Sequence, residues 1–174
     1  MTPNVMICRG NIVYSKDRNE LAAHSDSYIA VEDGRVEGIY ERLPEKFEGT
    51  PVKDFGDNVI IPAFSDLHVH APQFPQRGLG MDLLLADWLN TYTFPQEAKF
   101  ADPAYAEAEY GAFVQSLIEN GTFHACVFGT IHRKTTSRLL ERMEERKLRA
   151  FVGREEIRER YPDLCEEIGY LAAD

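Results

Sequence analysis

The sequence has no apolar run of the roughly 18 residues that a membrane-spanning helix needs, although 44% of its 174 residues are hydrophobic. Its N-terminus, MTPNVMICRGNIVYSKDRNE, also lacks the basic segment followed by an apolar segment that marks a signal peptide. We therefore expect a cytoplasmic protein without a membrane partner, with enough apolar material for a packed core.

Basic residues are also scarce. Lysine and arginine number 19 against 29 aspartates and glutamates, so the formal net charge is −10. Nucleic acids and anionic membranes both favour basic protein surfaces. The charge balance therefore argues against a nucleic-acid partner and against a polybasic membrane contact.

Cysteine occurs at only three positions, Cys8, Cys126 and Cys165, and no two of them form a C-x-x-C pair. An odd number of widely spaced cysteines predicts neither a disulfide framework nor a cysteine zinc site. We expect free thiols in a reducing compartment.

The first 57 residues have the pattern of a small antiparallel β unit. VMICRGNIVYSK is rich in β-branched residues, and Asp33-Gly34 between two apolar runs predicts a hairpin turn. Residues 16–27 are polar and residues 42–57 contain prolines and glycines, so both segments are predicted to be loops.

From residue 58 the pattern changes to that of an α/β fold. NVIIPAFSDLHVH begins as a buried strand would, and a long loop is predicted over residues 71–100. Asp102 and Pro103 then suit the start of a helix that ends near Gly121. The stretches TFHACVFGTIH, KTTSRLLERMEERKLR and AFVG follow as strand, helix and strand. This alternation over residues 58–153 predicts a parallel sheet.

His68 and His70 end the first of these strands. Residues i and i+2 of a strand point to the same face, so both imidazoles can reach one metal ion. Imidazole nitrogen suits zinc, and a catalytic zinc site has about three protein ligands and a water molecule. An H-x-H pair alone is a weak motif, however, and two histidines paired with other polar groups are the alternative.

The segment PAFSDLHVHAPQFPQRGLGMDLLLADWLNTYTFPQEAKF resembles the guanine deaminases of the metal-dependent amidohydrolase superfamily. That superfamily opens its barrel with Pro-Gly-x-x-Asp-x-His-x-His, which this chain matches from Pro62 to His70 with Ala63 in place of glycine. The continuation Ala-Pro-Gln73-Phe has the guanine deaminase form, in which the glutamine hydrogen-bonds the purine. The stretches GLGMD, LADWL and YTFP are typical of the same family.

The resemblance implies a fold, an activity and a set of site residues. Residues 1–57 would form the N-terminal half of a β-sandwich-like unit, and residues 58–153 the start of a (β/α)8 barrel. His68 and His70 would bind Zn2+, and Gln73 would contact guanine, the small-molecule substrate. The reaction would be the hydrolytic deamination of guanine to xanthine and ammonia, a step of purine catabolism, carried out by a homodimer of the full-length protein.

The family's remaining site residues have no counterpart in this sequence. They comprise two further metal histidines, the glutamate of a His-x-x-Glu motif and a late aspartate, so no catalytic residue is identifiable. A complete barrel takes about 250 residues, which predicts an incomplete barrel and a chain that is inactive by itself. Residues 154–174 match the family poorly, which leaves a truncation, an internal deletion or a divergent helix as explanations.

Two other functions stay open at this stage. The chain could be a non-catalytic remnant, or a deaminase of another ring such as cytosine or a triazine, although Gln73 and the GLGMD stretch favour guanine. His124 and His132 are predicted to be core or edge histidines. Glu97 and Glu107 are predicted to be solvated acids.

Overall fold

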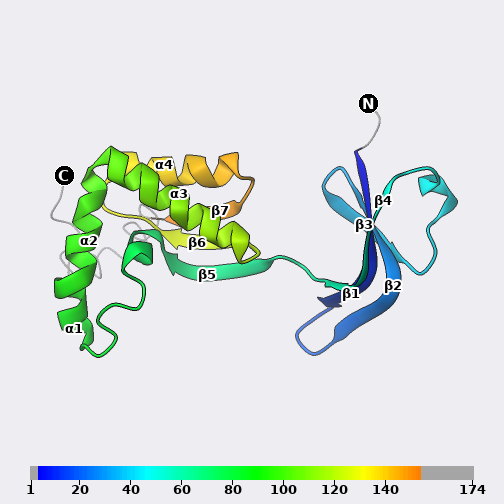
Figure 1. The fold of residues 1–174 in the computed structure, drawn as a ribbon, viewed down its shortest axis with the longest axis horizontal. Coiled ribbons are helices and arrows are strands. Elements are labelled where there is room, and N and C mark those ends of the chain that lie inside the picture. Colours follow the sequence, from blue (N-terminus) through cyan, green and yellow to red (C-terminus); the bar gives the residue numbers. More distant parts are fainter. Residues whose placement is uncertain (1–3, 154–174) are drawn as a thin grey trace. The chain divides into compact units, whose positions relative to one another are not determined.

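The computed structural model describes residues 4–153, and the predicted tail of residues 154–174 lies outside this range. Contacts divide the chain into two compact units, Met1–Pro62 and Ala63–Asp174, each of which is described by itself (Figure 1). The predicted domain boundary after residue 57 stays a prediction.

The first unit is a four-stranded sheet with the order β3-β2-β1-β4. The pairs β1–β2 and β2–β3 are antiparallel, whereas β4 pairs with β1 in parallel. Positive φ angles of 49° at Asp33 and 79° at Gly34 make the turn between β2 and β3, so the predicted hairpin is confirmed. The elements are β1 (Val5–Ser15), β2 (Leu21–Glu32), β3 (Arg35–Tyr40), the 3-10 turn η1 (Glu45–Phe47) and β4 (Val52–Ile60).

Two predicted loops of this unit were wrong in part. Strand β2 begins inside the segment 16–27, and β4 begins inside the segment 42–57, so the sheet is mixed rather than antiparallel. Most side chains of β4 are exposed, and its pairing rests on backbone hydrogen bonds to β1. Such a strand carries no apolar alternation that the sequence could reveal.

The second unit contains a parallel three-stranded sheet with the order β5-β6-β7. Strands alternate with helices, which confirms the α/β class, and the described strands do not close into a barrel. The elements are β5 (Phe64–His70), η2 (Ala71–Gln76), α1 (Leu85–Trp88), the π-helical turn η3 (Leu89–Thr93), α2 (Phe94–Ala98), η4 (Lys99–Ala101), α3 (Pro103–Glu119), β6 (Thr122–Phe128), α4 (Arg133–Glu145) and β7 (Arg149–Gly153).

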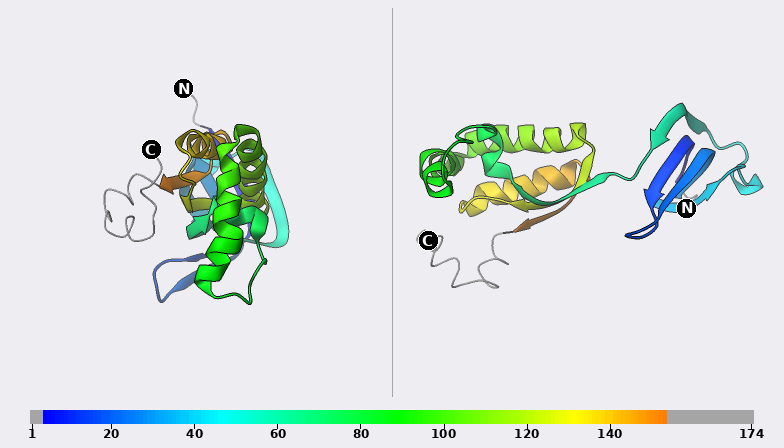
Figure 2. Two further views of the ribbon diagram at one scale, coloured as in Figure 1. Left: turned by 90° about the vertical axis from the view of Figure 1, so that its left-hand side faces the viewer. Right: turned by 90° about the horizontal axis from the view of Figure 1, so that it is seen from below.

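Helices α3 and α4 cover one face of this sheet, as Figure 2 shows. Alternate residues of β6, Ala125 and Val127, are buried against Phe113 of α3 and Leu139 of α4. Because side chains alternate along a strand, the intervening residues point to the other face. Helices α3 and α4 do not cover this second face, so polar side chains at the ends of β5 and β6 can lie on it. None of the helices between residues 4 and 153 is long and apolar enough to span a membrane.

The loop predicted over residues 71–100 was wrong, because most of this segment forms short helical turns, η2 to η4. Pro72 and Pro75 lie within η2, Gly78 and Gly80 follow it, and from Leu85 to Ala101 the elements α1, η3, α2 and η4 follow one another without a gap. The run from Leu85 to Ala101 changes from α-helical to π-helical, back to α-helical and then to 3-10 geometry, so no single helical period in the sequence could reveal it.

Candidate active site

His68 and His70 lie at the C-terminal end of β5 and point to the same face. Their Nε2 atoms are 3.3 Å apart, and their ring centroids are 5.2 Å apart. The shared face is what the i, i+2 spacing predicts, while the role of the two rings as metal ligands stays a prediction. Either a hydrogen bond between the rings or a cation held by both satisfies the 3.3 Å separation.

The distance between the Nε2 atoms of His68 and His70 is the distance expected between two ligands of one zinc ion. Two nitrogen ligands at about 2.0–2.1 Å from a tetrahedral zinc ion lie ~3.3 Å from each other. The pair therefore fits two positions of a tetrahedral site. Within residues 4–153 no third histidine, cysteine or carboxylate joins them in a cluster that could complete the coordination.

Phe128, the last residue of β6, packs against both histidines. Its ring lies 4.8 Å from that of His68 and 4.7 Å from that of His70, which it stacks upon. The parallel register pairs Phe128 directly with His70. Sequence reasoning missed this residue, because only the strand pairing brings it to the site.

The surroundings of His70 favour its neutral form. Burial lowers the pKa of His70, and the neighbouring His68 lowers it further. A metal ligand must be neutral imidazole, so this environment suits coordination. Asp66 supports the strand end, since its carboxylate accepts a hydrogen bond of 3.0 Å from the backbone nitrogen of His68.

A hollow of about 320 Å3 opens beside the two rings. Gln73, whose predicted contact with the purine stays a prediction, lies in its wall, and so does Trp88, whose indole nitrogen donates a 2.9 Å hydrogen bond to the carbonyl of Leu79. The GLGMD and LADWL stretches thus help to enclose it. The polar and aromatic residues of the wall are His68, His70, Gln73, Phe74, Gln76, Arg77, Trp88 and Phe113.

Glu97 is not the solvated acid that the sequence predicted. It is partly buried on α2. Burial raises the pKa of Glu97. Glu107, in contrast, lies on α3 in an ion pair of 2.8 Å with Arg138, away from the hollow.

Comparison with known proteins agrees with this geometry. The model of the Amidohydrolase family matches residues 59–172. The chain belongs to the amidohydrolase family.

Individual amidohydrolases similar to the chain are guanine deaminases. The guanine deaminase of Dictyostelium discoideum is 34% identical over 86% of this chain and 37% of its own length. A probable guanine deaminase of Schizosaccharomyces pombe is 38% identical over 91% of this chain and 32% of its own. The guanine deaminase of C. acetobutylicum, solved with guanine in its active site, superposes with a TM-score of 0.84 at 41% identity, over 86% of this chain and 36% of its own. The chain thus spans about a third of the length of these relatives.

The other two histidines of this amidohydrolase unit lie away from the His68–His70 pair. His124 is exposed, and its Nδ1 is 3.3 Å from the hydroxyl of Ser65. The backbone carbonyl of His132 accepts hydrogen bonds from the first turn of α4. Because His124 is exposed on the central strand β6 and His132 is partly buried before α4, their predicted roles as core or edge histidines stay predictions.

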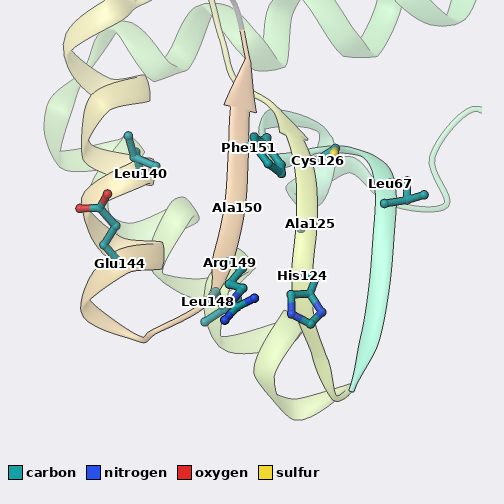
Figure 3. Close-up of a pocket in the computed structure, with 10 residues that line it drawn as sticks. All are labelled: Leu67, His124, Ala125, Cys126, Leu140, Glu144, Leu148, Arg149, Ala150 and Phe151. Carbon is teal, nitrogen blue, oxygen red and sulfur yellow. The ribbon is translucent and has the colours of Figure 1, made fainter. Parts of the chain in front are cut away.

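His124 also lines a second hollow, of about 560 Å3, shown in Figure 3. Its wall consists mainly of apolar residues of β6, β7 and α4, such as Cys126, Leu140 and Phe151. It borders β7, the last strand of the described sheet. We take it as a feature of the open sheet, since neither His68 nor His70 lies in its wall.

Proposed function

We propose that the chain forms part of a zinc-dependent guanine deaminase, which converts guanine and water to xanthine and ammonia. The observation that carries the proposal is the 3.3 Å separation of the His68 and His70 Nε2 atoms beside a hollow that contains Gln73. The similarity to guanine deaminases over 86–91% of the chain supports the choice of substrate. A homodimer and a cytoplasmic location, which the family resemblance suggests, form part of the same proposal.

In this proposal each residue of the site has a separate task. His68 and His70 would hold the metal through Nε2, and Phe128 would support them, since its ring stacks on that of His70 and packs at a tilt against that of His68. A metal bound there would supply a nucleophilic water molecule near neutral pH. Gln73 would orient the purine by hydrogen bonds, while Trp88 and its neighbours exclude water from the hollow. Further metal ligands and a proton-transfer group would have to come from outside the described residues.

The proposal is tested by titrating the 174-residue chain with guanine in the presence and absence of zinc, with NMR signals of the glutamine side-chain amides as the readout. We expect guanine with zinc to shift the Gln73 signals, and cytosine to shift them much less. Gln73→Ala should remove the response, and Gln115→Ala, which changes an exposed glutamine of α3, should keep it. A stronger response to cytosine or to a triazine would contradict the choice of guanine.

A further inference from the structure

The guanidinium group of Arg77 lies on the ring of Phe74. Its Cζ atom is 3.5 Å from the centroid of that ring, which is the distance of van der Waals stacking. Phe74 in turn meets Phe113 of α3 edge to face, with ring centroids 5.7 Å apart, and Phe113 is buried in the core. All three residues lie in the wall of the hollow beside His68 and His70. The stack therefore ties an otherwise exposed arginine to the packed interior.

Arg77 keeps its hydrogen-bonding capacity in this position. Stacking uses the face of the guanidinium plane, whereas its five N–H donors point outward in that plane. Within residues 4–153 no hydrogen bond or ion pair occupies these donors. Two other donors of the wall are already engaged. Gln76 donates to the hydroxyl of Thr93 at 2.9 Å, and the indole of Trp88 donates to a backbone carbonyl. Arg77 is thus the stronger of the donors left for a ligand.

The wall of the hollow also carries a charge of opposite sign to that of the whole chain. The formal net charge of the sequence is −10, whereas no aspartate or glutamate is among the described residues of the wall. With histidine counted as neutral, Arg77 is the one formally charged side chain among them. A positive charge beside a largely apolar wall favours ligands with negative or strongly polar acceptors and disfavours cations.

We infer that Arg77 is a specificity-determining residue of the hollow, whose guanidinium group binds the acceptor edge of the ligand. The ligand class that fits is a planar heterocycle with a carbonyl oxygen beside a ring nitrogen, because the fork of arginine pairs with two neighbouring acceptors. The inference rests on the proposed function, because it takes a purine as the occupant. Guanine offers these two acceptors, whereas an amino group in place of the oxygen would set a donor against the fork.

Two matched purines test this selection. Guanine and 2,6-diaminopurine, in which an amino group replaces the carbonyl oxygen, are titrated into the 174-residue chain with zinc. The readout is the NMR signal of the indole N–H of Trp88, the single tryptophan of the chain, which lies in the same wall. We expect the parent chain to bind guanine about tenfold more tightly, as a hydrogen bond from a charged donor implies. Arg77→Met should remove the preference, and a preference that survives in Arg77→Met would overturn the proposal.

Two further variants separate the guanidinium fork from net charge and from folding. Lys53→Met is the matched control, because it removes one positive charge that lies 5.0 Å over the ring of Phe55 in strand β4 of the other unit. It should keep the preference for guanine. Arg77→Lys keeps the charge without the fork and should give an intermediate preference. If Arg77→Met does not fold, Arg77→Lys decides, since the full preference in that variant would contradict the role of the fork.

Ionic quenchers distinguish this inference from the proposed function, because they need no purine. Iodide and caesium are used on the fluorescence of Trp88, with neutral acrylamide as the reference. We expect Arg77→Met to lower iodide quenching about twofold and to raise caesium quenching, as the loss of a unit charge about 10 Å away in water does. Lys53→Met should change neither.

The quenching and the purine titrations have separate outcomes. The expected quenching in a chain that is indifferent to guanine would support selection by Arg77 and overturn guanine as the ligand. A preference for guanine in every variant, with iodide quenching unchanged in Arg77→Met, would support the substrate and overturn the role of Arg77.

Discussion

At the scale of single residues, the site depends on two imidazoles whose neutral forms are needed at the same time. His68 is exposed, whereas His70 is partly buried and stacked on Phe128. Both rings come from one strand end, so their spacing needs no contribution from distant parts of the chain. The pair can therefore form even where the rest of a metal site is missing.

Metal binding tests the histidine pair directly. Two protein ligands instead of about three should hold zinc weakly, so we expect substoichiometric zinc in the purified chain. Replacing both His68 and His70 by alanine should abolish the binding measured by calorimetry. His24→Ala, in strand β2 of the other unit, is the control and should leave binding unchanged. Tight zinc binding that survives the double change would place the metal elsewhere.

Gly80 shows how the wall of the hollow depends on one small residue. Its φ is 64°, and a Cβ atom there would lie 2.5 Å from the ring of Tyr92. Gly78 has a φ of 77°, but no atom lies near the position of its Cβ. A substitution at Gly78 therefore measures backbone strain alone, whereas one at Gly80 adds a steric conflict. We expect Gly78→Ala to lower the free energy of unfolding by about 1–2 kcal/mol, and Gly80→Ala to lower it by about 1–3 kcal/mol more.

Urea unfolding followed by tryptophan fluorescence measures both glycine variants. Trp88 is the single tryptophan of the chain and lies in this wall, so its emission reports on the segment that the variants change. Equal losses of unfolding free energy in the two variants would show that the Tyr92 ring moves away from the added methyl group. Only the backbone strain at a positive φ would then destabilise the variants.

At the scale of elements, helix α3 owes its start to one side chain. Asp102 accepts a 2.8 Å hydrogen bond from the backbone nitrogen of Ala104, and Pro103 takes the first helical position. Asp102→Ala should cost about 1 kcal/mol of stability, whereas Asp102→Asn should cost little because asparagine caps equally well. Hydrogen exchange at Ala104 checks this, and equal protection in both variants would contradict the capping role.

The elements that the sequence predicted correctly are those with local signals. The cap at Asp102, the terminating Gly121 with its φ of 71° and the turn at Asp33 each depend on residues within a few positions. Strand β4 was missed because its pairing partner lies about 45 residues earlier in register, at Arg9 and Asp54. Pairing over such a distance leaves no periodic pattern in an exposed strand.

The candidate site likewise contains residues that local sequence signals predicted and residues that only tertiary contacts reveal. His68, His70 and Gln73 were predicted from a contiguous motif, and the structure places all three beside one hollow. Phe128 was missed because it reaches the site only through strand pairing. Glu97 was misjudged because it is partly buried on α2, which contacts the turn η2 from an earlier part of the chain. Tertiary contacts, rather than local pattern, decide such roles.

At the scale of the whole molecule, the described part of the second unit is an open sheet rather than a closed barrel. Its three strands carry exposed apolar residues, among them Leu67, which is 74% exposed, and Phe151, which is 76% exposed. A closed eight-stranded barrel buries the side chains of its interior in layers. The relatives, of which this chain covers only 36–37%, have the additional chain that such closure requires.

The open sheet bears on the guanine deaminase activity that we expect of the 174-residue chain. Deamination needs an activated water molecule, a group that transfers protons and an oriented purine. The described residues offer two proposed metal ligands and one proposed purine contact, and Glu97 does not line the hollow beside the histidine pair. General acid–base help alone is worth about 10²- to 10⁴-fold in rate, and a metal held by two ligands is held weakly. We therefore expect no measurable guanine deamination by the 174-residue chain.

The assay combines purified chain, zinc and guanine, with xanthine formation followed by absorbance. His70→Ala serves as the matched background, because it removes a proposed ligand that is only partly buried at the end of β5. Turnover in the parent chain that His70→Ala abolishes would contradict the expectation. If a second copy of the chain then supplied the missing ligands, the rate per chain would rise with protein concentration as that assembly forms. A rate independent of concentration would instead require the missing groups to lie within the single chain.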